Sequence, residues 1–168
     1  MAVAAAEARA DVTSLGTVEF TFDQVSSVLH QTISIEAFKV LDPINHLLLR
    51  SVLAEMEQAL SQRFMAEIHI ANGMVSPGSL KFEKGQIVVT SPRLAVIICA
   101  LTVVMHYDDL RTNVIQIYKD VSAIVHAIPH PPEVSGIIFK PADPDHVIAD
   151  LEPFLPSNVR EIIRKRRP

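Results

Sequence analysis

Seven histidines, several with carboxylates close by, are the residues of this 168-residue sequence that could do acid–base or metal chemistry. The most compact group is His106, Asp108 and Asp109, where a carboxylate could orient the imidazole for proton transfer. The structural alternative is that an aspartate caps the following helix while His106 lies at the negative end of the preceding one. The structural interpretation is favoured, so we assign no catalytic residue. A small hydrolase that uses His106 with Asp109 stays as an alternative function.

A metal site is a second possibility, at His126, His130 and Glu133. The two histidines are four residues apart, as in zinc-binding helices, but Pro129 between them prevents a shared, uninterrupted helix face. We therefore expect no metal ligand, and a metal-dependent hydrolase is only an alternative. The five glycines form no phosphate-binding loop, so no nucleotide cofactor is expected.

The C-terminus carries the clearest binding signal. Residues 160–168 hold five basic residues and one acidic residue, a charge of +4, which leaves −8 on the rest of a chain whose net charge is −4. The acidic body makes nucleic-acid binding unfavourable. The tail could instead contact an anionic membrane surface or an acidic protein, or fold onto its own acidic surface. The predicted anion-binding or partner-binding residues are Arg160, Arg164, Lys165, Arg166 and Arg167.

Composition is that of a folded domain. Hydrophobic residues make up 49% and charged residues 20%, with a mean hydropathy of +0.28, which excludes a disordered chain. The single cysteine, Cys99, excludes an intramolecular disulfide framework and favours a reducing, cytoplasmic location. The first ten residues contain six alanines but lack the pattern of a signal peptide.

Strand patterns recur along the chain. Apolar residues alternate over residues 17–22 and 66–71, and residues 80–89 read as a hairpin that reverses at Gly85 with positive φ. Residues 33–41 fit either a strand or a helix. The predicted fold class is α+β: a mostly antiparallel sheet of about four to five strands backed by helices, with a Pro-rich C-terminal strap and a short terminal helix.

Two helices are predicted from the local sequence. Asp42-Pro43 is a helix start and predicts a helix over residues 43–63. Its expected core-facing positions are Ile44, Leu47, Leu48, Val52, Met56 and Leu60. Residues 94–105 are almost wholly apolar but far shorter than a membrane-spanning helix. We expect a fully buried helix there, with a protein interface or membrane insertion after a conformational change as alternatives.

The next helix, over residues 110–128, shows a narrow apolar seam. Its members alternate at steps of four and three residues, as in a coiled coil: Leu110, Val114, Ile117, Val121, Ile124 and Ile128. The seam is too short for an autonomous coiled coil, so packing within the chain is favoured. Pairing with a second copy is the alternative, and these residues are the predicted interface. Ile115, Tyr118 and Val125 lie outside the seam and indicate a second contact face.

The chain is expected to comprise a flexible Ala-rich N-terminus (residues 1–16), an α+β core (17–128) and a Pro-rich strap with a basic C-terminal helix (129–168). Eight of the eleven prolines lie in the last segment. An edge strand is predicted over residues 136–140, a short helix after Asp143-Pro144, and a final helix beginning near Ser157.

These features favour a noncatalytic assembly or adaptor module. It would associate with itself, or with a protein partner, through the residue 110–128 helix or the C-terminal strap. One alternative is a membrane-directed accessory or effector module that uses residues 94–105 and the basic tail. The other is the small hydrolase described above. An enzyme is the less favoured class.

Overall fold

The computed structural model describes residues 11–23, 27–78 and 80–166. Its strands are β1 (Val12–Phe22), β2 (Ile33–Ser34), β3 (Ile68–Ala71), β4 (Met74–Ser76), β5 (Lys81–Thr90) and β6 (Val134–Pro141). Its helices are α2 (Ile35–Leu41), α3 (Pro43–Phe64), α4 (Ser91–Leu101), α5 (Tyr107–Ala127), α6 (Pro144–Leu151) and α7 (Ser157–Arg166), with a 3-10 turn at Glu152–Phe154. The predicted α+β class is confirmed.

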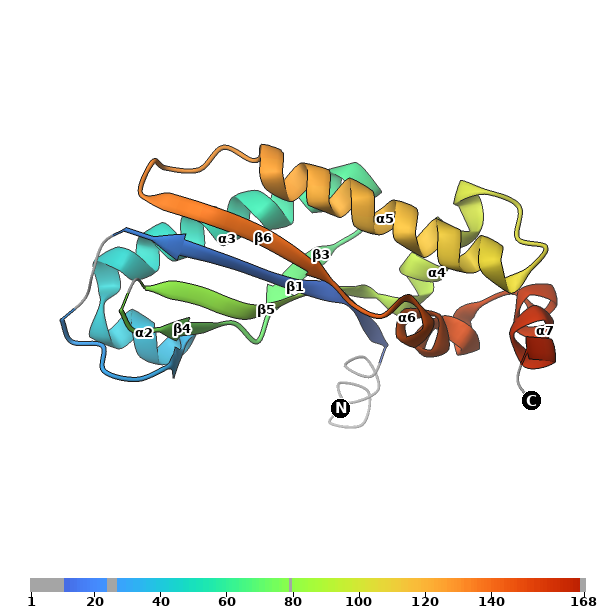
Figure 1. The fold of residues 1–168 in the computed structure, drawn as a ribbon, viewed down its shortest axis with the longest axis horizontal. Coiled ribbons are helices and arrows are strands. Elements are labelled where there is room, and N and C mark those ends of the chain that lie inside the picture. The colour runs from blue at the N-terminus through green and yellow to red at the C-terminus, as the bar shows by residue number, and fades with distance from the viewer. Residues whose placement is uncertain (1–10, 24–26, 79, 167–168) are drawn as a thin grey trace.

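The strands form one sheet in the order β2-β4-β5-β1-β6, in which β3 also pairs with β5 and every pair is antiparallel. Helices α3 and α5 run along the sheet, while α6 and α7 lie at the opposite end of the molecule from α2 (Figure 1). The apolar residues of β1 and β5 are buried in the same core as those of α3 and α5. Helices therefore back the sheet, as expected.

Strand β1 begins at Val12, inside the segment expected to be a flexible N-terminus. The pairing register with β5 shifts between Ser14 and Gly16, so Leu15 interrupts the alternation of buried and half-buried residues. This irregularity hides the first part of the strand from a period-two search. Gly16 is required because a Cβ there would lie 2.3 Å from the Lys140 carbonyl oxygen.

The predicted hairpin at Gly85 is wrong, because β5 continues from Lys81 to Thr90. Strands β3 and β4 both pair with β5 in one continuous register, so the chain also does not reverse at Asn72-Gly73, a dipeptide typical of turns. Asn72 has φ 59° and Lys84 on β5 has φ 58°. Asn72-Gly73 and Lys84-Gly85 are therefore local irregularities within the pairing of β3 and β4 with β5. The Phe82 ring lies against both glycines, Gly73 and Gly85. A side chain on either glycine would clash with that ring.

Residues 33–41 resolve as the two-residue strand β2 followed by α2, which Ser34 caps by accepting from the Ala37 amide (3.2 Å). Helix α3 begins at Pro43 as predicted, and the Asp42 carboxylate accepts from the Asn45 amide (3.3 Å). Its predicted core face is wrong in the first two turns. Ile44 and Leu47 are exposed, and the buried residues are Asn45, His46, Leu49, Val52, Leu53, Met56 and Leu60.

Helix α4 spans Ser91–Leu101, so it begins earlier and ends earlier than the predicted residues 94–105, and Thr102 after it is extended. It is not fully buried. Val96 is 58% exposed, and Val103 and Met105 in the connection to α5 are 82% and 68% exposed. Asn113 of α5 donates to the Ile98 carbonyl (2.9 Å) and thereby holds the end of α4.

The C-terminal predictions agree well with the structure. β6 is an edge strand beside β1. The Asp143 carboxylate caps α6 by accepting from the Asp145 amide (3.0 Å), and α7 begins at Ser157. Because β6 is part of the sheet, these residues share the core with β1.

Candidate interaction surfaces

The residue 110–128 seam faces the core of its own chain. Five of its six members are at most 6% exposed, namely Leu110, Val114, Ile117, Val121 and Ile128, and Ile124 is half-buried. Helix α5 packs against α3, α4 and β6. The seam therefore packs within its own chain in this structure, as the sequence favours, and its pairing with a second copy stays a prediction.

An exposed apolar surface lies instead where α2 meets α3. Val40, Ile44 and Leu47 are 79%, 76% and 70% exposed, and Leu41 is 46% exposed. We call these four residues the α2–α3 patch. Exposed aliphatic residues are common singly, so four of them within eight residues of one helix junction make this junction a candidate interaction surface. Sequence reasoning named Ile44 and Leu47 but placed both in the core.

The local cause of this exposure is the orientation of α3. Asp42 caps the helix and also accepts from the Asn45 side-chain amide (2.8 Å), while Asn45 and His46 are buried. Asn45 Oδ1 has no hydrogen-bond partner. With polar residues turned inward, the aliphatic residues on either side are turned outward. Glu36, Lys39 and Arg50 are exposed close to the patch in sequence, and the charges of all three act on His46.

The basic tail is folded onto the rest of the chain. Val159 and Ile163 are buried, and Arg166 lies with Cζ 3.9 Å from the centre of the Tyr107 ring. Arg166 Nη1 is also 3.9 Å from Asp108 Oδ1, and Arg164 Nε is 4.0 Å from Glu152 Oε1. This is the arrangement in which the tail meets its own acidic surface.

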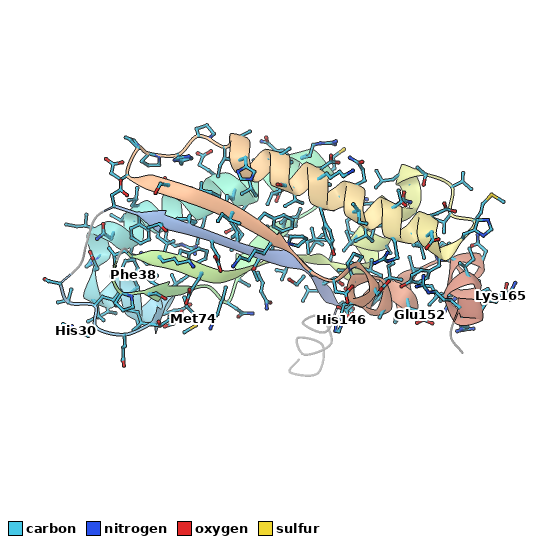
Figure 2. All side chains as sticks on the ribbon, in the orientation of Figure 1. His30, Phe38, Met74, His146, Glu152 and Lys165 are labelled. Carbon is cyan, nitrogen blue, oxygen red and sulfur yellow. The ribbon has the colours of Figure 1, made fainter. Side chains whose placement is uncertain are left out.

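The remaining tail residues are placed differently. Lys165 is exposed at the end of the molecule farthest from Phe38 of α2 (Figure 2). Arg160 donates to the Ser157 hydroxyl (3.3 Å), and its Nε is buried without a partner. Arg167 lies outside the described residues. A hollow of about 450 Å³ beside the tail is lined by Met105, His106, Tyr107, Asp108, Ile162, Lys165 and Arg166.

A small polar network fixes the helix starts beneath the tail. Tyr107 donates from its hydroxyl to Asp145 Oδ1 (2.7 Å), and Arg111 Nε donates to the same oxygen (3.0 Å). Burial and the bond to Asp145 raise the pKa of Tyr107 to about 12. The bond from Tyr107 and the Arg111 charge lower the pKa of Asp145. Nothing in this arrangement activates a nucleophile.

Asp109 has the structural role that the sequence favours, but His106 does not lie at the end of the preceding helix, because α4 ends at Leu101 and His106 is the N-cap residue of α5. Its Oδ2 accepts from the backbone amides of Met105 and His106, both at 2.9 Å, and these bonds lower the pKa of the carboxyl. Among residues 11–23, 27–78 and 80–166, no three histidine, cysteine or acidic side chains are grouped so that they could hold a metal ion. Across the same residues, every helix is too short or too polar to span a bilayer.

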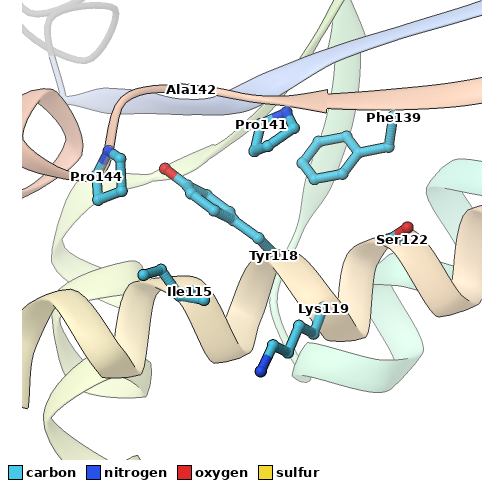
Figure 3. Close-up of a pocket in the computed structure, with 8 residues that line it drawn as sticks. All are labelled: Ile115, Tyr118, Lys119, Ser122, Phe139, Pro141, Ala142 and Pro144. Atoms are coloured by element: carbon cyan, nitrogen blue, oxygen red, sulfur yellow. The ribbon is translucent and has the colours of Figure 1, made fainter.

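A groove of about 380 Å³ lies between one face of α5 and the end of β6 with its connection to α6 (Figure 3). We call it the α5–β6 groove. Its lining comes from one face of α5 and from residues 139–144: Ile115, Tyr118, Lys119, Ser122, Phe139, Pro141, Ala142 and Pro144. Tyr118 and Phe139 pack edge to face with ring centres 6.1 Å apart.

Tyr118 is unusual among these residues. Its hydroxyl is buried and has no hydrogen-bond partner, and burial, aided by the Asp143 charge, raises its pKa to about 12. An orphaned buried polar group costs ~1–3 kcal/mol. Sequence analysis placed Tyr118 and Ile115 outside the seam, on a second contact face, but gave no signal of a groove. That signal needs β6, which lies far away in the sequence.

The fold is an antiparallel sheet with helices along it, in the α+β class. No family model, no curated protein and no solved structure matches the chain significantly.

Proposed function

We propose that this protein is a noncatalytic assembly module that associates with a second copy of itself through the α2–α3 patch. The observation that carries this proposal is the exposure of four large aliphatic side chains at one helix junction. Removing such surface from water is favourable by ~25 cal/mol per Å².

A second copy is the favoured partner for two reasons. A two-fold axis through an apolar patch sets the patch against itself, so no separate complementary surface is needed. The rim charges fit this arrangement, because Glu36 of one protomer can lie opposite Lys39 or Arg50 of the other. These three side chains are exposed, so they can form the polar rim that surrounds the core of a typical interface.

Light scattering over a dilution series tests the proposal. We expect the intact chain to have twice its 18.5 kDa mass at high concentration. Ile44→Glu should give a folded monomer, because a charge at the centre of the patch must be desolvated on association. Val103→Glu is the matched control, since Val103 is equally exposed but lies outside the patch. A monomer at every concentration, or a dimer that survives Ile44→Glu, contradicts the proposal.

The basic tail supports a second candidate contact, with an anionic membrane surface. The hollow beside the tail brings together His106, Lys165 and Arg166, of which Lys165 is exposed and has no ion pair among the described residues. Co-sedimentation with phosphatidylserine vesicles tests this contact, and phosphatidylcholine vesicles are the control. Lys165→Glu should weaken sedimentation with the anionic vesicles only. Equal binding to both lipids argues against it.

A further inference from the structure

We propose that the α5–β6 groove binds a small, uncharged and mostly apolar molecule that carries one oxygen acceptor, such as the carbonyl of an aromatic ketone. This site is separate from the assembly surface, because the α2–α3 patch contributes none of its lining.

The size and walls of the groove suit such a molecule. A volume of about 380 Å³ falls in the range of small-molecule pockets. Ile115, Phe139, Pro141, Ala142 and Pro144 supply apolar walls, and Tyr118 adds an aromatic ring that lies across the groove (Figure 3). Aromatic rings set edge to face can accept a further flat ring.

The requirement for one acceptor comes from Tyr118. Its hydroxyl has no partner within the chain, and with a pKa of about 12 it keeps its proton at neutral pH and acts as a donor. Replacing the hydroxyl by hydrogen would keep the packing and remove the unsatisfied group. A tyrosine at this position is therefore explained better by a ligand oxygen than by packing.

The neutral charge of the ligand follows from the surroundings of the Tyr118 hydroxyl. The Asp143 carboxylate acts on this hydroxyl and disfavours an anion at that end of the groove. The hydroxyl is a donor and requires an acceptor, not a cationic donor. The Lys119 ammonium points away from the Tyr118 hydroxyl in Figure 3 and does not balance an anion there. An uncharged acceptor therefore fits this end of the groove.

The hydroxyl lies at the Pro144 end of the groove, closed off from solvent (Figure 3). Binding as proposed requires residues 142–144 to move outward, so that a ligand oxygen can reach the hydroxyl. Beyond Pro141 this connection is tied to the sheet by a hydrogen bond from the Ala142 amide to the Leu15 carbonyl (3.0 Å). Binding and a small displacement of the connection are therefore coupled.

A nuclear magnetic resonance titration of the full chain with acetophenone tests the proposal. Ethylbenzene is the matched probe, because it has a similar shape but no oxygen. Both should shift the amide signals of Ile115, Tyr118 and Ala142. Acetophenone should bind about ten-fold more tightly, since it gains the hydrogen bond to the hydroxyl.

Two variants decide the interpretation. Tyr118→Phe keeps the ring and should abolish the preference for acetophenone, whereas Tyr107→Phe removes a hydroxyl elsewhere and should leave the preference intact. Ala142→Leu fills the groove and should weaken both probes. The proposal is overturned if neither probe binds, if the shifts lie outside the groove, or if the preference persists in Tyr118→Phe. None of these outcomes bears on self-association, which light scattering measures separately.

Discussion

The guanidinium of Arg166 lies over the ring of Tyr107, with Cζ 3.9 Å from the ring centre. This contact joins the last turn of α7 to the first turn of α5. A basic residue that the sequence offers to an outside partner is thus already engaged by an aromatic side chain of its own chain. The strength of this contact decides how readily the basic tail can detach from the rest of the chain.

Replacing Arg166 should loosen α7. A cation–π contact at a partly exposed site contributes ~0.5–1 kcal/mol, so Arg166→Ala should speed hydrogen exchange of the α7 amides about two- to five-fold. Lys165→Ala is the control, because Lys165 makes no such contact with an aromatic ring among the described residues. Equal exchange in the two variants would show that Val159 and Ile163 alone hold the helix.

Gly85→Ala should destabilise the sheet by ~1–3 kcal/mol, the usual cost of overpacking a core. A Cβ on Gly85 would lie 2.5 Å from the ring of Phe82, which is fully buried and cannot move aside. Urea unfolding measures the free energy of unfolding of the variant and of the intact chain. The double variant Gly85→Ala/Phe82→Leu should lose less stability than the two single changes together. Simple additivity would rule out the ring as the cause.

The stability of the protein should depend on pH through two histidines that act in opposite directions. Burial, with the charges of Arg50 and Lys39, lowers the pKa of His46 from 6.5. The folded chain then binds fewer protons than the unfolded chain just below pH 6.5, so this contribution to stability is lost as the pH falls. His46→Gln should therefore make the loss of stability on acidification shallower.

His69 should act in the opposite direction. Its hydrogen bond to Glu57, aided by one to Glu67, raises its pKa above 6.5. Its stabilising contribution is fully present below pH 6.5 and is lost as the pH rises through the folded pKa. His69→Gln should make the loss on acidification steeper. Denaturant unfolding at about pH 5.5 and about pH 8 compares both variants with the intact chain. Shifts of the same sign in the two variants would refute this assignment.

Tyr118, which is buried, and Tyr107, which is half-buried, should respond in opposite ways to loss of the hydroxyl. Tyr118→Phe removes an orphaned polar group and should stabilise the protein by ~1–2 kcal/mol, whereas Tyr107→Phe loses the bond to Asp145 and should destabilise it by ~0.5–1.5 kcal/mol. Thermal unfolding measures both changes. A destabilised Tyr118→Phe variant would mean that the hydroxyl is satisfied in solution.

Local chemistry made several elements readable from the sequence. Asp42-Pro43, Asp143-Pro144 and Ser157 start helices for reasons contained in a few neighbouring residues, and each helix is present. Periodicity was less informative where two faces of an element are apolar. In α3 the residues Ile44 and Leu47 extend the stripe of Val52, but polar Asn45 and His46 take the buried positions.

Glycine was ambiguous for a related reason. Glycine is favoured both in a turn and at an irregular position within paired strands. Gly85 therefore indicated a hairpin, although in the structure it leaves room for the ring of Phe82. The candidate surfaces were harder still to predict. The α5–β6 groove exists only because Phe139 is brought beside Tyr118, and no local pattern in the sequence records that proximity.

The position of β1 between β5 and the edge strand β6 has a consequence for synthesis on the ribosome. β1 is the first of the six described strands to be made, yet its partner β6 is the last of them, and Gly16 pairs with Pro141. Such distant pairing slows folding, because the entropic cost of closing a long loop comes before the strand pairing can stabilise the fold. One edge of β1 therefore stays open while most of the chain emerges, and chaperone binding or premature pairing with a neighbouring nascent chain would act at that edge.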